Sequence, residues 1–144
     1  MKKVAEEWLE AANDDLETVE EILDNSRLTH ITAFHVQQCV EKSFKAVLEN
    51  HEEEVPRVHN LITLHGRIDK LLPEEAEVDV AMLERLNQLY IDARYPGEQG
   101  LLPQGKPSTE EAQQFFRFAK RMRAMVDRRV REDEEVQGGN RPKE

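Results

Sequence analysis

Residues 33–48, AFHVQQCVEKSFKAVL, contain neither Gly nor Pro and have the apolar periodicity of an α-helix. Most of the apolar side chains fall on one broad face when successive residues are placed about 100° apart. These residues are Ala33, Val36, Val40, Phe44, Val47 and Leu48. A second stripe carries the small residues Cys39, Ser43 and Ala46. A helix with one side in water does not need small residues on a second stripe, so we expect this helix to be covered on two sides.

Four further segments predict the other helices of a bundle built around this one. Residues 4–23 and 109–131 have long helical periodicities, and shorter ones occupy residues 61–71 and 80–94. Asn60, Asp79 and Ser108 stand where the N-caps of the last three helices are expected, and Glu111 completes a capping box with Ser108. We find no strand pattern and no internal repeat. The predicted fold is all-α, an antiparallel up-and-down bundle of four to five helices.

The length of 144 residues suits a single domain that is large enough to bury a core. We assign residues 1–131 to the helical bundle. Residues 132–144 are acidic and then rich in glycine, and this composition predicts a disordered tail. All candidate functional residues therefore belong to the bundle.

The formal net charge is −10, which argues against non-specific binding to nucleic acid. The charge is unevenly spread, because residues 117–131 hold seven Lys and Arg residues against one acidic residue. Arg117, Lys120, Arg121 and Arg128 share one sector of the predicted last helix. Two interpretations stay open for this sector: an ordinary solvated face, or a weak docking surface for an acidic partner or RNA.

Three features bear on the cellular compartment. Cys39 is the single cysteine, which excludes an internal disulfide and suits a reducing cytoplasm. The longest apolar runs are far shorter than the ~20 residues of a membrane span. Acidic residues near the N-terminus occupy the place where a signal peptide needs an apolar region. We expect a cytoplasmic protein without a membrane segment.

The motifs of common cofactor and metal sites are incomplete in this chain. Residues 100–106, GLLPQGK, match the start of a P-loop, but Pro107 stands where the magnesium-binding Ser or Thr is required. The five histidines form neither H-x-x-x-H nor the E-x-x-H of di-iron bundles. Cys39 belongs to the small-residue stripe of a buried helix, which does not suit a nucleophile. The sequence therefore predicts no metal site and no cofactor.

Two charged residues stand on the apolar faces of their predicted helices. Asp15 lies between Trp8 and Val19 on the inward face of the first helix. Arg94 projects from the inward face of the helix over residues 80–94. A buried charge is costly unless it is paired or hydrogen-bonded. We therefore expect each of the two to have a partner of opposite charge in the folded protein.

Four motifs in a fixed order carry a resemblance to a known family. They are A-x-x-D-L at residues 12–16, AFHVQQCVEKSFKA at 33–46, H-N-L-x-x-L at 59–64 and YIDARYPG at 90–97. With these motifs the chain resembles the HEPN family (higher eukaryotes and prokaryotes nucleotide-binding) over residues 5–130. The resemblance implies an up-and-down helical bundle that is commonly dimeric.

The resemblance also implies a choice of functions. Prokaryotic members are often encoded beside a minimal nucleotidyltransferase, in two-component or toxin–antitoxin systems. Several branches are metal-independent ribonucleases with an R-x4–6-H motif, in which Arg and His of two subunits meet. Arg94 matches that Arg, but Gln99, Gly100 and Leu101 occupy the positions of the His. Without this general acid or base we expect no such enzyme activity.

The site candidates combine residues of the family motifs with the charged residues on apolar faces. They are Asp15, Gln38, Glu41, Lys42, Lys45, His59, Tyr90 and Arg94, with Gln37 as an alternative to Gln38. We expect Asp15 and Glu41 to form a buried network with Arg94, with the two lysines and the histidine at the mouth of a cleft. Two interpretations stay open: a site for a phosphate-bearing ligand or an RNA phosphate, or a polar network that fixes helix register without a ligand.

The sequence as a whole favours a non-catalytic HEPN module. Its expected partner is a minimal nucleotidyltransferase in a toxin–antitoxin-like system, with a nucleotide held at their interface. The alternatives are a divergent HEPN ribonuclease toxin and a dimeric scaffold without a ligand. We also expect a homodimer, formed through the small-residue stripe or through the surface of residues 80–94.

Overall fold

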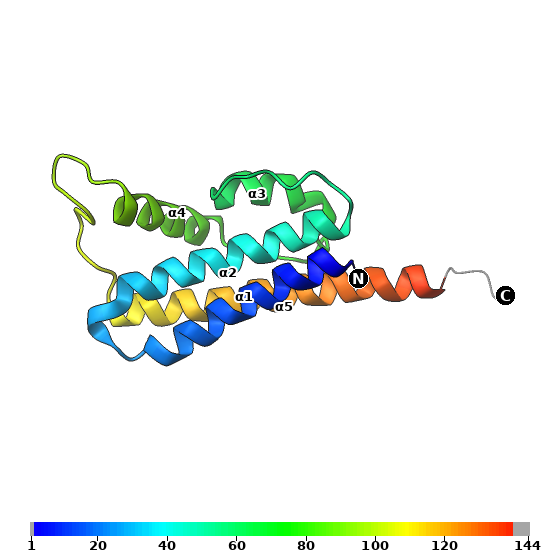
Figure 1. The fold of residues 1–144 in the computed structure, drawn as a ribbon, viewed down its shortest axis with the longest axis horizontal. Coiled ribbons are helices and arrows are strands. Elements are labelled where there is room, and N and C mark those ends of the chain that lie inside the picture. The colour runs from blue at the N-terminus through cyan, green and yellow to red at the C-terminus, as the bar shows by residue number, and fades with distance from the viewer. Residues whose placement is uncertain (1, 140–144) are drawn as a thin grey trace.

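The computed structural model describes residues 2–139, with side chains as far as Glu134, and this part of the chain is all-helical. Its helices are α1 (Lys3–Ile22), α2 (Thr29–Asn50), α3 (Leu61–Ile68), α4 (Val80–Arg94) and α5 (Thr109–Gly139), with 3-10 turns at Ser26–Leu28 and Asp69–Leu71. Figure 1 shows α2 along the middle, with α1 and α5 on one side of it and α3 and α4 on the other. The predicted helical bundle is confirmed.

Helix α2 forms the centre of the core. Large side chains such as Phe44 and Leu48 are buried in one apolar cluster to which all five helices contribute. The small residues Cys39, Ser43 and Ala46 are each 0% exposed, because α1 and α5 pack closely against this helix. The other helices of the same chain thus cover α2 on both sides. Its two-sided burial needs no second copy of the chain, so this reason for expecting a homodimer no longer holds.

Side chains fix the starts of three helices as the sequence predicts. The carboxamide oxygen of Asn60 accepts hydrogen bonds from two backbone N–H groups of α3, and the carboxylate of Asp79 accepts one from α4. The hydroxyl of Ser108 accepts a hydrogen bond from the backbone N–H of Glu111, at 3.0 Å. The Glu111 carboxylate does not return to Ser108 but pairs with Arg85 of α4 at 3.0 Å, and so ties α5 to α4.

Helix α5 continues to Gly139, beyond residue 131, after which the sequence predicts a disordered tail. Acidic residues such as Glu are good helix formers, and contacts with the bundle help them to continue the helix. One carboxylate oxygen of Asp133 lies 2.9 Å from Nε2 of His51, directly after α2, and Arg129 pairs with the same carboxylate from one turn earlier. Residues 140–144, the rest of the predicted tail, lie outside the described residues.

Replacing Phe44 by Ala tests the dependence of the bundle on α2. Phe44 is fully buried, and losing a buried aromatic ring costs about 3–5 kcal/mol. We expect the free energy of unfolding, measured by urea denaturation, to fall by about this amount. Leu101→Ala is the control, because this side chain is 54% exposed and its loss should cost less than about 0.5 kcal/mol. Equal losses in the two variants would contradict the core described here.

Candidate functional site

Arg94, at the end of α4, is exposed and lies over two aromatic rings. The carbon atom of its guanidinium is 4.7 Å from the ring centroid of Phe34 and 4.5 Å from that of Tyr90. The two rings have centroids 6.1 Å apart and planes 13° apart, so together they form one aromatic surface beneath the guanidinium. Cation–π attraction holds the arginine in this place without neutralising its charge.

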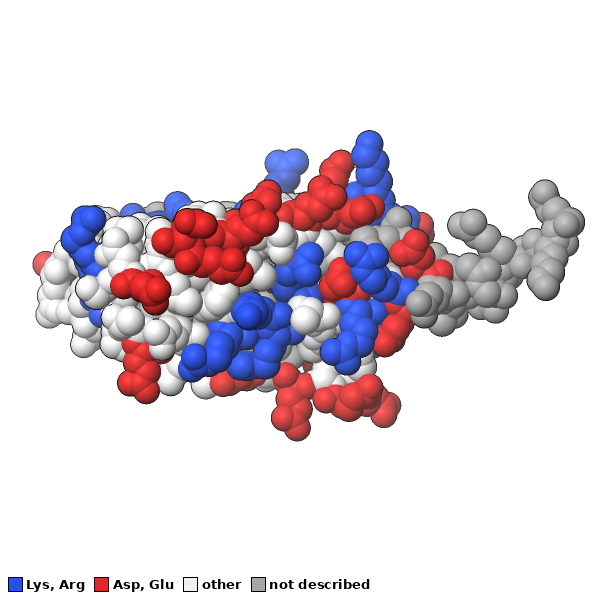
Figure 2. All heavy atoms as spheres, turned by 90° about the horizontal axis from the view of Figure 1, so that it is seen from below, with Lys and Arg blue, Asp and Glu red and all other residues white. Residues whose placement is uncertain are grey.

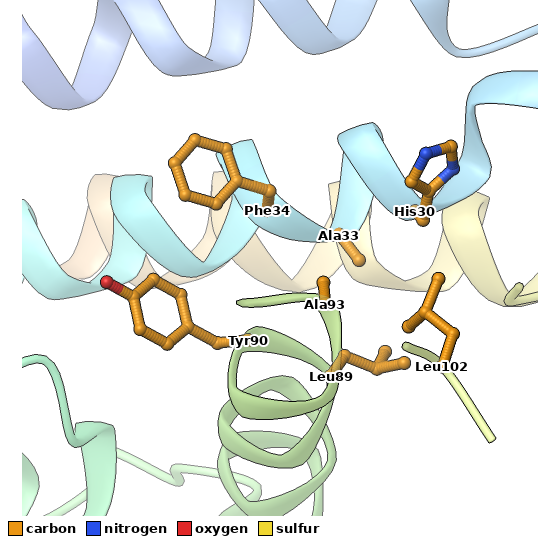
Figure 3. Close-up of a pocket in the computed structure, with 7 residues that line it drawn as sticks. All are labelled: His30, Ala33, Phe34, Leu89, Tyr90, Ala93 and Leu102. Atoms are coloured by element: carbon orange, nitrogen blue, oxygen red, sulfur yellow. The ribbon is translucent and has the colours of Figure 1, made fainter. Parts of the chain in front are cut away.

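A small cavity lies between the helices that carry these rings. Figure 3 shows Phe34 from α2 and Tyr90 from α4 at one end of it, with His30 and Leu102 at the other. Its volume is about 10 Å³, which is room for one water molecule at most. Burial raises the pKa of the Tyr90 phenol, so this group stays neutral at pH 7. A ligand larger than water must therefore bind on the surface above the rings.

The predicted buried network of Asp15, Glu41 and Arg94 does not form. Arg94 is exposed and forms no ion pair with a carboxylate among the described side chains. The helical periodicity places the first carbon atoms of the Arg94 side chain on the inward face of the helix. The arginine side chain is long enough to turn its guanidinium back toward water. Lys45 also differs from expectation, because it is 6% exposed and does not stand at the mouth of a cleft.

Asp15 of α1 is instead paired with two side chains of α2. Its side chain is 9% exposed, and the amine of Lys42 donates to Oδ2 at 2.8 Å. Nδ1 of His35 lies 2.9 Å from Oδ1. Both carboxylate oxygens thus have partners, which offsets the cost of burying the charge. This cluster joins the middle of α1 to the outer face of α2.

Glu41 of α2 is the centre of a second polar cluster. Its side chain is 4% exposed, and the amine of Lys45 donates to Oε2 at 3.1 Å. Nδ1 of His59 lies 2.8 Å from Oε1, and the amide of Gln37 donates to the same oxygen at 3.3 Å. The Gln37 amide also donates to the backbone carbonyl of His59 at 2.8 Å. This cluster therefore joins α2 to the segment that leads into α3.

The two clusters border the aromatic surface under Arg94. The ring centroid of His35 is 5.1 Å from that of Phe34, and the ring centroid of His59 is 5.4 Å from that of Tyr90. The side chain of His59 is 58% exposed and that of His35 is 25% exposed. Each histidine binds a carboxylate through Nδ1, which leaves Nε2 available to a ligand. The surface thus combines a planar cation, two rings and two oriented imidazoles.

Phe34 and His35 were not predicted from the sequence as part of the site, and Gln37 was only an alternative to Gln38. All three belong to the motif at residues 33–46. Phe34 lies off the apolar face of its helix, and a large aromatic residue in that position is the signal that could have identified it. Gln38, which was predicted, is half-buried and donates to the side-chain oxygen of Gln37 at 2.7 Å.

The sequence model of the HEPN domain family matches residues 5–130 of this chain. The chain belongs to the HEPN family. The solved structure of TT1696 from Thermus thermophilus is 24% identical, with a TM-score of 0.71 over 89% of this chain and 99% of that one. ST0689, an archaeal HEPN homologue, is 23% identical, with a TM-score of 0.68 over 90% of this chain and 99% of its own. At these identities the two structures show the fold alone. No curated protein matches the chain.

The loop after α4 carries the positions where HEPN ribonucleases have their histidine. Gln99, Gly100 and Leu101 stand there, and none of them has a side chain that exchanges protons near pH 7. Among the described residues, no three His, Cys, Asp or Glu side chains converge on a possible metal site. Within the same part of the chain, no helix is long and apolar enough to span a membrane.

The thiol of Cys39 should be unreactive in the folded HEPN domain. Burial raises its pKa to about 12, and the charge of nearby Asp15 adds to the rise, so the thiol stays protonated at pH 8. We expect a disulfide reagent at pH 8 to modify Cys39 no faster than the protein unfolds, and at once in 6 M guanidinium chloride. Complete reaction of the native protein within seconds would contradict the buried position.

The two lysines should contribute unequally to stability. Replacing Lys45 by Met removes the main cation beside the buried Glu41 carboxylate, so we expect a loss of about 3 kcal/mol in the free energy of unfolding. Lys42→Met is the matched control, because the side chain of Lys42 is 24% exposed and Asp15 keeps His35 as a partner. Its expected loss is about 1 kcal/mol. Urea denaturation measures both, and a larger loss for Lys42→Met would contradict the burial described here.

Proposed function

We propose that this HEPN domain is a non-catalytic module that binds a nucleotide on the surface formed by α2 and α4. One observation carries the proposal: Arg94 is exposed on the rings of Phe34 and Tyr90 and has no carboxylate partner among the described side chains. The free face of a guanidinium stacks on a nucleobase, and its N–H groups bind phosphate oxygens. A nucleotide contains both groups.

The surroundings of Arg94 support a phosphate-bearing ligand. His59 and His35 lie on either side of the aromatic pair, and the partly exposed side chain of Lys42 is paired with Asp15, so this acid leaves no free negative charge to repel a phosphate. Gln38 adds a polar group to the Glu41 cluster, where it donates to the side-chain oxygen of Gln37. The overall charge of −10 opposes a long polyanion. A mononucleotide or another small phosphorylated ligand therefore suits the site better than a long RNA.

The proposed protein partner is a minimal nucleotidyltransferase, with which the domain would form a cytoplasmic two-component system of the toxin–antitoxin kind. The family resemblance motivates this partner. Two exposed apolar side chains of the same region support a protein contact, since Ile91 is 47% exposed and Tyr95 is 67% exposed. The nucleotide would then lie between the two proteins, with Arg94 on one side of it. Co-purification from the native host, followed by mass spectrometry, identifies a bound protein and nucleotide.

A divergent ribonuclease is the second candidate. His35 and His59 are each held by a carboxylate and share a surface with Arg94, which is a possible arrangement for acid–base catalysis. The first proposal expects no cleavage, since the family's histidine is missing after Arg94. Cleavage of RNA in the presence of EDTA that disappears in Arg94→Ala would replace the binding proposal by the ribonuclease. If neither cleavage nor binding occurs, the dimeric scaffold remains.

Arg94→Ala separates ligand binding from stability. Because Arg94 is exposed, its loss should change the free energy of unfolding by less than about 1 kcal/mol. Titration with ATP and GTP by calorimetry should show at least a tenfold loss of affinity. Arg94→Lys keeps the positive charge but lacks the planar guanidinium, so its affinity for the nucleotide should lie between those of Arg94→Ala and the wild type. Arg117→Ala, at an exposed arginine of α5, is the control and should bind as the wild type does. Unchanged affinity in Arg94→Ala would reject the site.

A further inference from the structure

The outer face of α5 carries a row of cations that the proposed function does not use. Arg117, Arg121 and Arg128 are spaced by four and seven residues, which aligns them along one side of the helix, and all three are exposed. Lys120 lies beside them, over the ring of Phe116. None of these four cations, the basic row, forms an ion pair with another described side chain. Figure 2 shows Lys and Arg side chains gathered along the middle of this face.

The basic row destabilises its own helix. Like charges four residues apart repel each other, and Arg117 and Arg121 have no acidic residue three or four positions away on either side. By contrast, Arg131 of the same helix pairs with Asp127, four residues earlier, at 3.1 Å. The chain has 30 acidic residues against 20 basic ones, so a lack of acids does not explain the unpaired row. An anionic group bound along the row relieves the repulsion within it.

A groove adjoins the basic row at Arg128. It lies between α5 and the segment that leads to α4, and Pro73 and Ala76 of that segment line it together with Met125 of α5. Its volume is about 160 Å³, which is the volume of about five water molecules. Pro73, Ala76 and Met125 give the groove apolar walls, so it has room for one aliphatic side chain. The groove thus offers an apolar anchor point beside a row of positive charge.

The surroundings of the row favour an acidic protein segment over a nucleic acid. The exposed residues Glu75 and Glu132 also line the groove. Helix α1, which packs against α5, is acidic as well, and Figure 2 shows Asp and Glu side chains in a band beside the basic one. Both groups of carboxylates repel the phosphates of a nucleic acid. A partner helix can present its acidic residues along one side only and so place them on the arginines alone.

We propose that the basic row and the groove together bind an acidic helix of a partner protein, with an apolar side chain of that helix in the groove. Arg117 and Arg128 are about 16 Å apart along α5, at 1.5 Å per residue, so three turns of a facing helix span the row. Each guanidinium can bind a carboxylate through two parallel N–H groups. This surface lies outside the proposed nucleotide site of α2 and α4 and does not depend on it.

The contact is expected to be weak and sensitive to salt. Three turns of helix cover less than the ~800 Å² per partner that stable complexes bury. Exposed ion pairs contribute little singly, but a row of carboxylates opposite a row of arginines steers the two helices together and fixes their register. The apolar side chain in the groove adds a contact that salt does not screen.

A designed peptide tests this surface. The probe is a capped, stapled helix of 18 residues, made of Ala and Gln except for Glu at positions 2, 6, 9 and 13 and Leu at positions 3 and 16. The four Glu form one row, and one of the two Leu reaches the groove in each orientation of the helix. NMR titration at 50 mM NaCl should shift the backbone amide signals of residues 117–132. The dissociation constant should rise about tenfold between 50 and 500 mM NaCl.

Charge variants locate the binding in the basic row. Arg117→Glu with Arg121→Glu should raise the dissociation constant of the peptide at least tenfold. Arg117→Gln with Arg121→Gln adds no negative charge and should raise it at least threefold while keeping the wild-type melting temperature. The matched control carries Arg57→Glu and Arg67→Glu, two exposed positions in and before α3, across α2 from α5 (Figure 1). It changes the net charge as much as the double reversal and should bind as the wild type does.

A second pair of changes tests the groove. Replacing both Leu of the peptide by Ala should weaken its binding to the wild type at least threefold. Met125→Gln keeps the length of a half-buried side chain and removes its apolar character. In this variant the two peptides should bind with nearly equal affinity, because the groove no longer favours the Leu side chain.

Three results would overturn the proposal. They are the absence of any shift with 1 mM peptide at 50 mM NaCl, equal binding of a peptide with the same composition but Glu distributed around the helix, and unchanged affinity in the folded charge-reversed variant. Binding of single-stranded RNA in place of the peptide, lost in the same variant, would assign the basic row to nucleic acid instead.

Discussion

The pairing of the buried Glu41 carboxylate positions much of the candidate site. Burying a carboxylate at this depth destabilises the protein unless donors surround it. Lys45 and Gln37 come from the same helix, but His59 comes from the segment before α3, so the chain must fold that segment onto α2. This contact brings the His59 ring to 5.4 Å from the ring of Tyr90. The His59 ring thus links the Glu41 cluster to α4, which also packs on α2 through the apolar core.

The buried carboxylate of Asp15 also positions part of the candidate site. Lys42 and His35 pair with this carboxylate, and the ring of His35 in turn contacts the ring of Phe34. Each of the two buried acids is therefore paired with one lysine of α2 and one histidine. Arg94 is left without a carboxylate partner among the described side chains and lies on the two rings instead. Because both buried acids are already paired, neither needs Arg94 as a partner.

The local sequence was sufficient to predict the helices and the residues at which three of them begin. Asn60, Asp79 and Ser108 cap the helices where the sequence predicted, because capping depends only on residues two or three positions away. The helix beyond residue 131 was missed because composition alone cannot show the contact of Asp133 with His51. That contact joins residues far apart in the chain.

The candidate site was predicted only in part, for a similar reason. Periodicity identified Asp15 as a buried acid in need of a partner, and Lys42, another candidate, is one of its two partners. Periodicity failed for Arg94, since the guanidinium lies several bonds away from the backbone whose direction the helix determines. The rings that hold it come from α2 and α4, and their approach is a property of the tertiary fold.

The candidate site depends most on Arg94 being held by aromatic rings and not by buried acids. A double-mutant cycle on the free energy of unfolding, with Arg94→Ala and Tyr90→Leu, tests this most directly. A coupling energy of about 0.5–1 kcal/mol between the two positions is the predicted result, as for an exposed cation–π contact. No coupling with Tyr90, together with a coupling of several kcal/mol between Arg94→Ala and Glu41→Gln in the parallel cycle, would contradict the account.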